Sequence, residues 1–129
     1  MTQEEMKKRT KAYALRILKL VESLPSTKTA DVLGKQLLRC GTSVGANYRA
    51  ACRAKSTADF IAKLAIVEEE ADESMYWIEV LVESSLVREN VVQNLLDEAN
   101  QILSIIVSAI KTSKEKRNPK SEFPNPKSL

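Results

Sequence analysis

The sequence predicts an all-α protein, an antiparallel four-helix bundle with up-down-up-down topology. Apolar residues recur at three- and four-residue intervals in four separate stretches, which is the spacing of one face of an α-helix. The 129 residues include three glycines and four prolines, and three of those prolines lie in the last eleven residues, so helix breakers are rare elsewhere. Because the connections between the four stretches are short, sequential helices are expected to pack as antiparallel neighbours.

The first helix is predicted between Thr2 and Pro25. Thr2 and Glu5 have the spacing of a capping box, and the residue before a proline is disfavoured in the α conformation, which ends the helix. Its core face consists of Met6, Thr10, Tyr13, Ile17, Leu20 and Leu24.

The second helix is predicted to begin after one of three N-cap candidates, Ser26, Thr27 or Thr29, and to extend to about Ala54. Its core face consists of Leu33, Leu37, Cys40, Val44, Tyr48 and Ala51. The opposite face carries cations at Lys35, Arg39, Arg49 and Arg53. Three glycines lie on one flank of the core face, at positions 34, 41 and 45, so we expect either a close neighbouring backbone or a local bend there.

The third helix is predicted from Thr57 to about Ser84, with Ser56 and Asp59 as its capping box. Its core face consists of Phe60, Leu64, Val67, Ala71, Ser74, Ile78 and Leu81. A second apolar face includes Ala62, Ile66, Tyr76, Trp77 and Val80. Because a helix with two apolar faces is seldom left in water, we expect a homo-oligomer. The candidate interface residues are Ile66, Glu69, Glu73, Tyr76, Trp77 and Val80.

The fourth helix is predicted to follow a short connection at residues 84–90. Its core face consists of Val92, Leu95, Ala99, Ile102, Ile106 and Ala109. Lys111 and Lys114 complement the helix dipole in its last turn. We expect the bundle to comprise residues 1–117 and residues 118–129 to form a disordered, basic, proline-containing tail.

The net charge of +3 conceals a strong segregation of charge along the chain. Residues 25–55 carry six basic and one acidic side chain, whereas residues 56–89 carry two basic and nine acidic ones. Two hypotheses follow: the basic face binds phosphates of RNA or DNA, or it contacts the acidic third helix of another subunit in a scaffold that recognises another protein. The candidate nucleic-acid-binding residues are Lys35, Arg39, Arg49, Arg53, Lys55, Lys111, Lys114, Lys116 and Arg117.

The sequence favours no catalytic function and no cofactor. It has no histidine, no glycine-rich phosphate loop and no CxxC pair. The acidic group Glu69, Glu70, Asp72 and Glu73 is a candidate metal site, but carboxylate metal sites in bundles also use Glu-x-x-His, and the sequence has no histidine. We therefore expect solvated or interface carboxylates instead. Ser43 and Asn47 are expected to be structural: the Ser43 hydroxyl bonds to its own helix, and the Asn47 amide bonds to a neighbouring helix.

The two cysteines, Cys40 and Cys52, fall on or beside one face of the second helix, about 18 Å apart, so they are expected to be reduced thiols. We see neither an apolar run long enough for a membrane span nor a secretory signal, and expect a cytoplasmic protein with no membrane partner.

Several short segments together resemble one known family. They are Ser43-Val44-Gly45-Ala46-Asn47-Tyr48, Lys55-Ser56, Phe60-Ile61 and Glu73. They are similar to the four-helix-bundle family named after proteins encoded in intervening sequences of 23S ribosomal RNA genes, with Gly45 where many members have proline. The resemblance covers roughly residues 11–114. It implies a homopentamer, related to the nucleic-acid-binding accessory protein of diversity-generating retroelements, and it implies no enzyme; for most members the biochemical role is unassigned.

Overall fold

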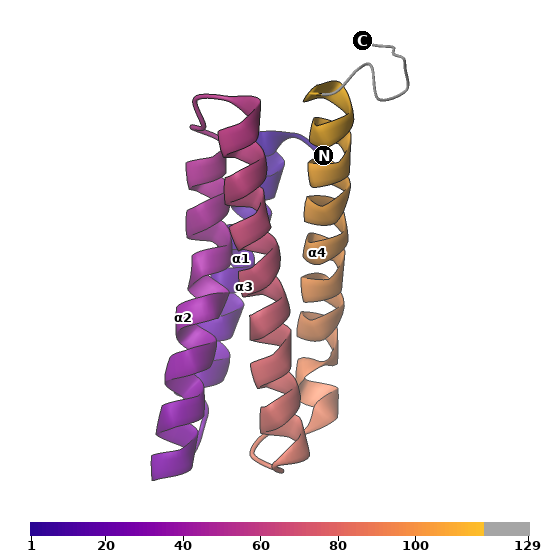
Figure 1. Cartoon of the computed structure of the whole chain (residues 1–129). Coiled ribbons are helices and arrows are strands. Elements are labelled where there is room, and N and C mark those ends of the chain that lie inside the picture. Colours follow the sequence, from indigo (N-terminus) through magenta and orange to yellow (C-terminus); the bar gives the residue numbers. More distant parts are fainter. Residues whose placement is uncertain (118–129) are drawn as a thin grey trace.

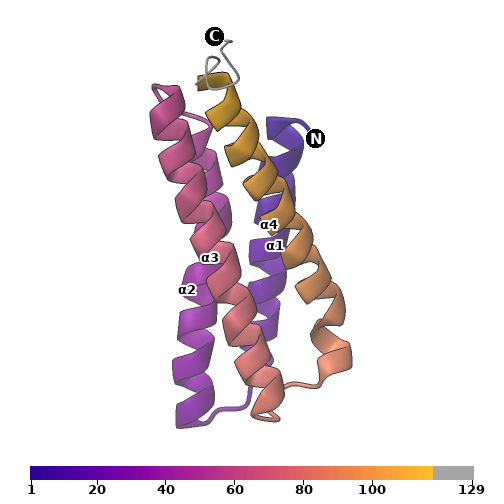
Figure 2. The same ribbon diagram turned by 45° about the vertical axis from the view of Figure 1, so that its right-hand side comes forward.

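The computed structural model describes residues 1–117, which form four α-helices. They are α1 (Gln3–Glu22), α2 (Lys28–Ala51), α3 (Thr57–Glu83) and α4 (Glu89–Arg117). Figures 1 and 2 show them side by side and alternating in direction, so that the start of α1 and the end of α4 lie at the same end of the bundle as the α2–α3 connection. The predicted all-α bundle is therefore confirmed.

The interior is built from the four predicted core faces. Side chains such as Ile17, Leu37, Val67 and Ile102 are fully buried, and they belong to one continuous apolar cluster. The last or first members of the predicted faces are partly buried and cover the ends of this cluster: Leu24, Leu33, Phe60 and Ala109. Helical spacing alone was sufficient to find this core, because burial follows the period of 3.6 residues in every helix.

The helix ends follow from local hydrogen bonds. Thr2 and Glu5 form the predicted reciprocal capping box on α1, and Thr27, one of the three predicted N-caps, accepts the Ala30 N–H at 3.1 Å. Helix α2 ends at Ala51, three residues before the predicted end. After Ala51 the backbone N–H groups of Arg53 and Ala54 donate to carbonyl oxygens three residues back, so the four-residue pattern of the α-helix stops. Helix α3 then begins at the Ser56 hydroxyl, which accepts the Asp59 N–H at 3.0 Å.

The α1–α2 contact is close because glycines of α2 face α1. A Cβ atom on Gly41 would lie 2.8 Å from Cγ2 of the buried Ile17, and one on Gly45 would lie 3.3 Å from the backbone carbonyl of Thr10. Helix α2 is continuous through this segment. The expected approach of a neighbouring backbone is thus seen at Gly45, with α1 as the neighbour.

Two polar contacts connect helices that have few close backbone contacts with each other. Helices α1 and α4 make the smallest contact between adjacent helices, and Arg9 joins them by donating from Nε and Nη2 to the two carboxylate oxygens of Glu98, at 2.6 and 2.8 Å. Across the core, the Tyr13 hydroxyl lies 2.7 Å from the hydroxyl of Ser74 on α3, and both side chains are buried. These contacts link α1 to α4 and α1 to α3 through side chains.

None of the helices within residues 1–117 combines the length and apolar character needed to cross a membrane.

Candidate nucleic-acid interface

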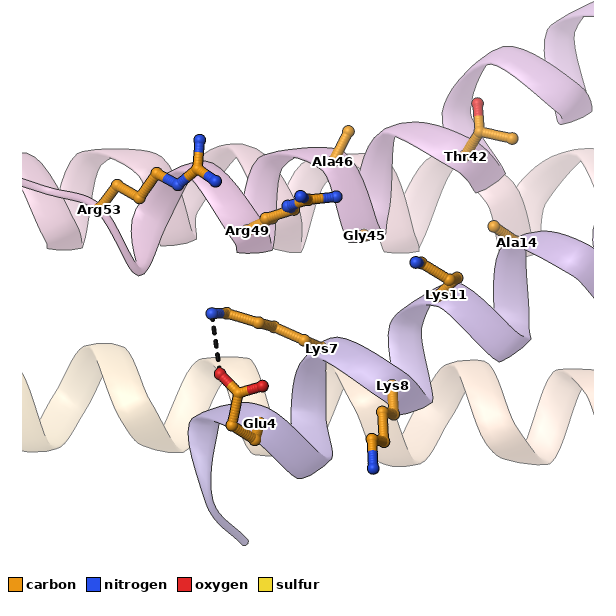
Figure 3. A pocket seen from close by; sticks show the side chains of 10 residues that line it. All are labelled: Glu4, Lys7, Lys8, Lys11, Ala14, Thr42, Gly45, Ala46, Arg49 and Arg53. Carbon is orange, nitrogen blue, oxygen red and sulfur yellow. Dashed lines mark hydrogen bonds and ion pairs between the residues drawn. The ribbon is translucent and has the colours of Figure 1, made fainter.

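A basic groove of about 510 Å³ lies between α1 and α2, near the end of the bundle where α1 begins. We define the basic groove by its charged lining residues, which are Glu4, Lys7, Lys8, Lys11, Arg49 and Arg53. The other lining residues are small: Ala14, Thr42, Gly45 and Ala46. In Figure 3, Lys7 and Lys11 point into the space between the two helices, and Arg49 approaches this space from α2.

Most of the groove cations have no carboxylate partner among residues 1–117. Lys7 is the exception, because its ammonium group pairs with Glu4 at 3.0 Å. Lys8, Lys11, Arg49 and Arg53 make no ion pair within 4.0 Å in the described part of the chain, and all four are exposed. Unpaired like charges on facing helices repel one another, and an anion in the groove would relieve that repulsion.

Arg39, in contrast, is paired within its own chain. It donates from Nη1 to Glu70 Oε1 at 3.3 Å and from Nη2 to Glu73 Oε2, so its charge faces the carboxylates of α3. The indole N–H of Trp77 donates to the same Glu73 oxygen at 3.2 Å. This hydrogen bond and the Arg39 guanidinium lower the pKa of Glu73 below its usual value.

The acidic side chains of α3 do not assemble as metal ligands. Glu70 and Glu73 bind Arg39, whereas Glu69 and Asp72 are exposed. Among residues 1–117, no three His, Cys, Asp or Glu side chains come together in a way that could hold an ion.

The structure divides the nine candidate nucleic-acid-binding residues among five places. Arg49 and Arg53 line the basic groove. Lys55 and Lys116 line a second hollow, of about 360 Å³, at the same end of the bundle. Arg39 pairs with α3, and Lys35 is exposed in the first half of α2, outside the groove. The remaining three are exposed in the last turns of α4: Lys111, Lys114 and Arg117. The predicted disordered tail, residues 118–129, lies outside the described residues.

The two structural candidates on α2 bond within their own helix. The Ser43 hydroxyl donates to the Arg39 carbonyl oxygen at 2.7 Å. The Asn47 amide donates to the Ser43 carbonyl oxygen at 2.9 Å, whereas the sequence suggested a bond to a neighbouring helix. The expectation for Asn47 was wrong because its half-buried amide reaches a carbonyl four residues back, one turn below it on the same helix.

Sequence reasoning missed the α1 half of the groove. Lys7, Lys8 and Lys11 belong to the segment KKRTK, in which four of five residues are cations. That cluster could have indicated a basic surface on α1. Which of its cations share a surface with Arg49 and Arg53 depends on how α1 packs against α2. Arg9, in the middle of the cluster, points instead to Glu98 on α4.

The candidate oligomer interface on α3 is partly open to solvent. Ile66 is 40% exposed and Tyr76 is 57% exposed, which are high values for large apolar side chains. Trp77 and Val80 are half-buried, and the rings of Tyr76 and Trp77 meet edge to face at 5.1 Å. These aromatic side chains lie on α3 and do not line the basic groove.

Comparison with known proteins places the chain in a family. Residues 2–108 match the family model described as 23S rRNA-intervening sequence protein. The chain is also similar to the crystal structure of a protein of unknown function from the S23 ribosomal protein family of Bacteroides thetaiotaomicron. The two share 36% sequence identity and a TM-score of 0.80, and the match covers 86% of this chain and 99% of that one. No curated protein matches. The chain therefore belongs to the 23S rRNA-intervening sequence protein family.

Proposed function

We propose that this protein is a non-enzymatic binder of nucleic acid that holds backbone phosphates in the basic groove. The observation that carries the proposal is a concave surface lined by five cations and one carboxylate, in which four cations lack an ion-pair partner among residues 1–117. Protein sites for nucleic acid are built in this way, since lysine and arginine neutralise phosphates and release the counterions condensed on them.

The lining of the groove suggests which part of the nucleic acid it contacts. Gly45, Ala46 and Ala14 are too small to keep a ligand away from the helix surfaces, so a phosphate could approach cations from both helices at once. None of the ten residues that line the groove is aromatic. Contacts there would therefore be to phosphates rather than to bases, which gives binding that depends strongly on salt and weakly on sequence.

The proposal is tested by fluorescence anisotropy with a labelled RNA and a labelled DNA duplex between 50 and 200 mM salt. Four phosphate contacts predict a slope of log K against log salt of about −3 to −4, which is a loss of about a hundredfold in affinity over that range. The variant carrying Arg49→Gln and Arg53→Gln should reduce the slope by about two. No salt-sensitive binding at micromolar protein would end the proposal.

A matched control separates the groove from total charge. Arg16→Gln with Arg88→Gln removes the same two charges from exposed arginines that do not line the groove. Its affinity should stay close to that of the wild type after allowance for the change in net charge. If both double variants weaken binding equally, the groove is not the binding site.

A second proposal concerns self-association, and the exposed face of α3 supports it. Burying Ile66 and Tyr76 against another copy would remove large apolar side chains from water, and the sequence resemblance implies a ring of five chains. Sedimentation of the wild type at low concentration should give a particle larger than 14.4 kDa. Ile66→Glu with Tyr76→Glu should return it to a monomer, whereas a wild-type monomer would contradict this proposal.

The same sedimentation experiment separates the two roles of the basic face. If Arg49→Gln with Arg53→Gln dissociates the oligomer, the groove serves subunit contacts and the protein is better described as a scaffold. If the oligomer persists while nucleic-acid binding is lost, the groove serves phosphates.

A further inference from the structure

We infer that the preferred ligand is single-stranded, with one unstacked base held in the second hollow while its backbone lies in the basic groove. This inference rests on the proposed function, because it needs the groove to hold phosphates. It adds a base-binding site that the groove itself lacks.

The two hollows are neighbours at one end of the bundle. Gln3 lines the second hollow and the next residue, Glu4, lines the groove; Cys52 lines the second hollow and the next residue, Arg53, lines the groove. The second hollow lies where α1 begins, α2 ends, α3 begins and α4 ends, which Figure 1 shows as one end of the molecule. A strand leaving the groove past Arg53 would therefore meet the second hollow directly.

The second hollow has the chemistry of a base site, which the groove does not. Phe60 lines it and is partly exposed, so it offers an aromatic surface on which a base could stack. Gln3, Ser113 and Thr57 supply hydrogen-bonding groups, and Lys55 and Lys116 supply charge for a flanking phosphate. With a volume of about 360 Å³, the hollow has room for one base.

A base can enter this hollow only if it is free of its own stack. In a duplex the bases face inward and are paired, so a duplex could place a phosphate ridge in the groove but could not stack a base on Phe60. The two hollows together therefore favour an unpaired strand, because only an unpaired base can stack on Phe60. The groove alone would bind single strands and duplexes equally well.

The experiment compares three twelve-nucleotide DNA ligands on the wild-type protein: a single strand, its duplex, and a strand of equal charge whose sugars carry no bases. Stacking of one base predicts about tenfold tighter binding of the normal strand than of the abasic strand, with similar salt slopes because the phosphates are the same.

Phe60→Leu is the informative variant, because leucine keeps apolar packing against the core but removes the aromatic face. It should abolish the preference for the normal strand while retaining salt-dependent binding. If wild-type protein binds normal and abasic strands equally and with the same salt slope, the base site is wrong and the groove proposal stands. If no ligand binds with salt sensitivity, both are wrong.

Discussion

Arg39 and Arg49 lie on the same basic face of α2 but meet different surroundings. Arg39 faces α3, where Glu70 and Glu73 accept its guanidinium hydrogen bonds. Arg49 faces α1, whose nearby groove side chains are lysines and a single glutamate already paired with Lys7. The helix that packs beside each cation thus decides its role. Cations that face acidic α3 form ion pairs within the bundle, whereas cations that face basic α1 remain available for a ligand.

The largest expected effect comes from reversing charge in the groove. Arg49→Glu with Arg53→Glu should lower affinity for a single-stranded oligonucleotide by about a hundredfold at low salt, because two attractions become repulsions. Both side chains are exposed and unpaired within the described residues, so the free energy of unfolding should change by less than about 0.5 kcal/mol. Anisotropy and urea unfolding measure the two quantities; a loss of stability with unchanged affinity would contradict the division of roles.

A smaller effect, on stability alone, is expected at the α1–α4 contact. Arg9 and Glu98 are only about one-fifth exposed, at 23% and 20%, and share two charged hydrogen bonds. Arg9→Ala or Glu98→Ala should each lower the free energy of unfolding by about 2 kcal/mol, and the double variant should cost little more than either alone. Oligonucleotide affinity should stay within about twofold. Additive single effects would show that the pair is not a coupled contact.

Alkaline pH should destabilise the folded protein through two buried side chains of the core. Burial raises the pKa of the Cys40 thiol to about 12 and that of the Tyr13 phenol to about 12, above their values in an unfolded chain. The unfolded state therefore loses these protons first, so the free energy of unfolding is constant below about pH 8 and falls as pH rises toward 12. Between pH 8 and pH 10 the loss should be about 1.5 kcal/mol. Cys40→Ala should remove most of this slope in urea unfolding, and an unchanged slope would exclude the thiol as its cause.

The smallest effect is expected at Arg39. Its side chain is 50% exposed, and ion pairs of that kind contribute less than about 1 kcal/mol. Arg39→Gln should lower the free energy of unfolding by less than about 1 kcal/mol and should leave oligonucleotide affinity unchanged. A single Arg49→Gln substitution, in contrast, should lower the affinity. Equal loss of affinity in the two variants would remove the distinction between the two arginines.

The sequence was sufficient for the fold because the fold depends on local periodicity. Residues such as Leu37 and Val67 could be placed in the core from spacing alone, and Thr2 and Ser56 could be placed at helix starts from capping patterns. The sequence shows which side chains are charged, but not which of them form ion pairs. The partners of Arg39 lie 31 and 34 residues away on α3, and no spacing rule reveals such pairs.

The groove itself depends on which faces of α1 and α2 meet. The glycines at positions 34, 41 and 45 indicated either a close neighbouring backbone or a local bend, and they did not show which helix the neighbour would be. Once α1 is known to be that neighbour, Lys7 and Lys11 join Arg49 and Arg53 on one surface. The site thus arises from packing between helices, which is why only its α2 half could be predicted from the sequence.

The most direct test of the central claim is an NMR titration of isotope-labelled protein with a single-stranded oligonucleotide, read residue by residue. The account predicts chemical-shift changes centred on residues 7–14 and 42–53, with a second group at residues 55–60 and 113–116, and little change at Arg39. Changes confined to the exposed face of α3 around Ile66 and Tyr76 would contradict it, because the ligand would then bind the aromatic face and not the unpaired cations between α1 and α2.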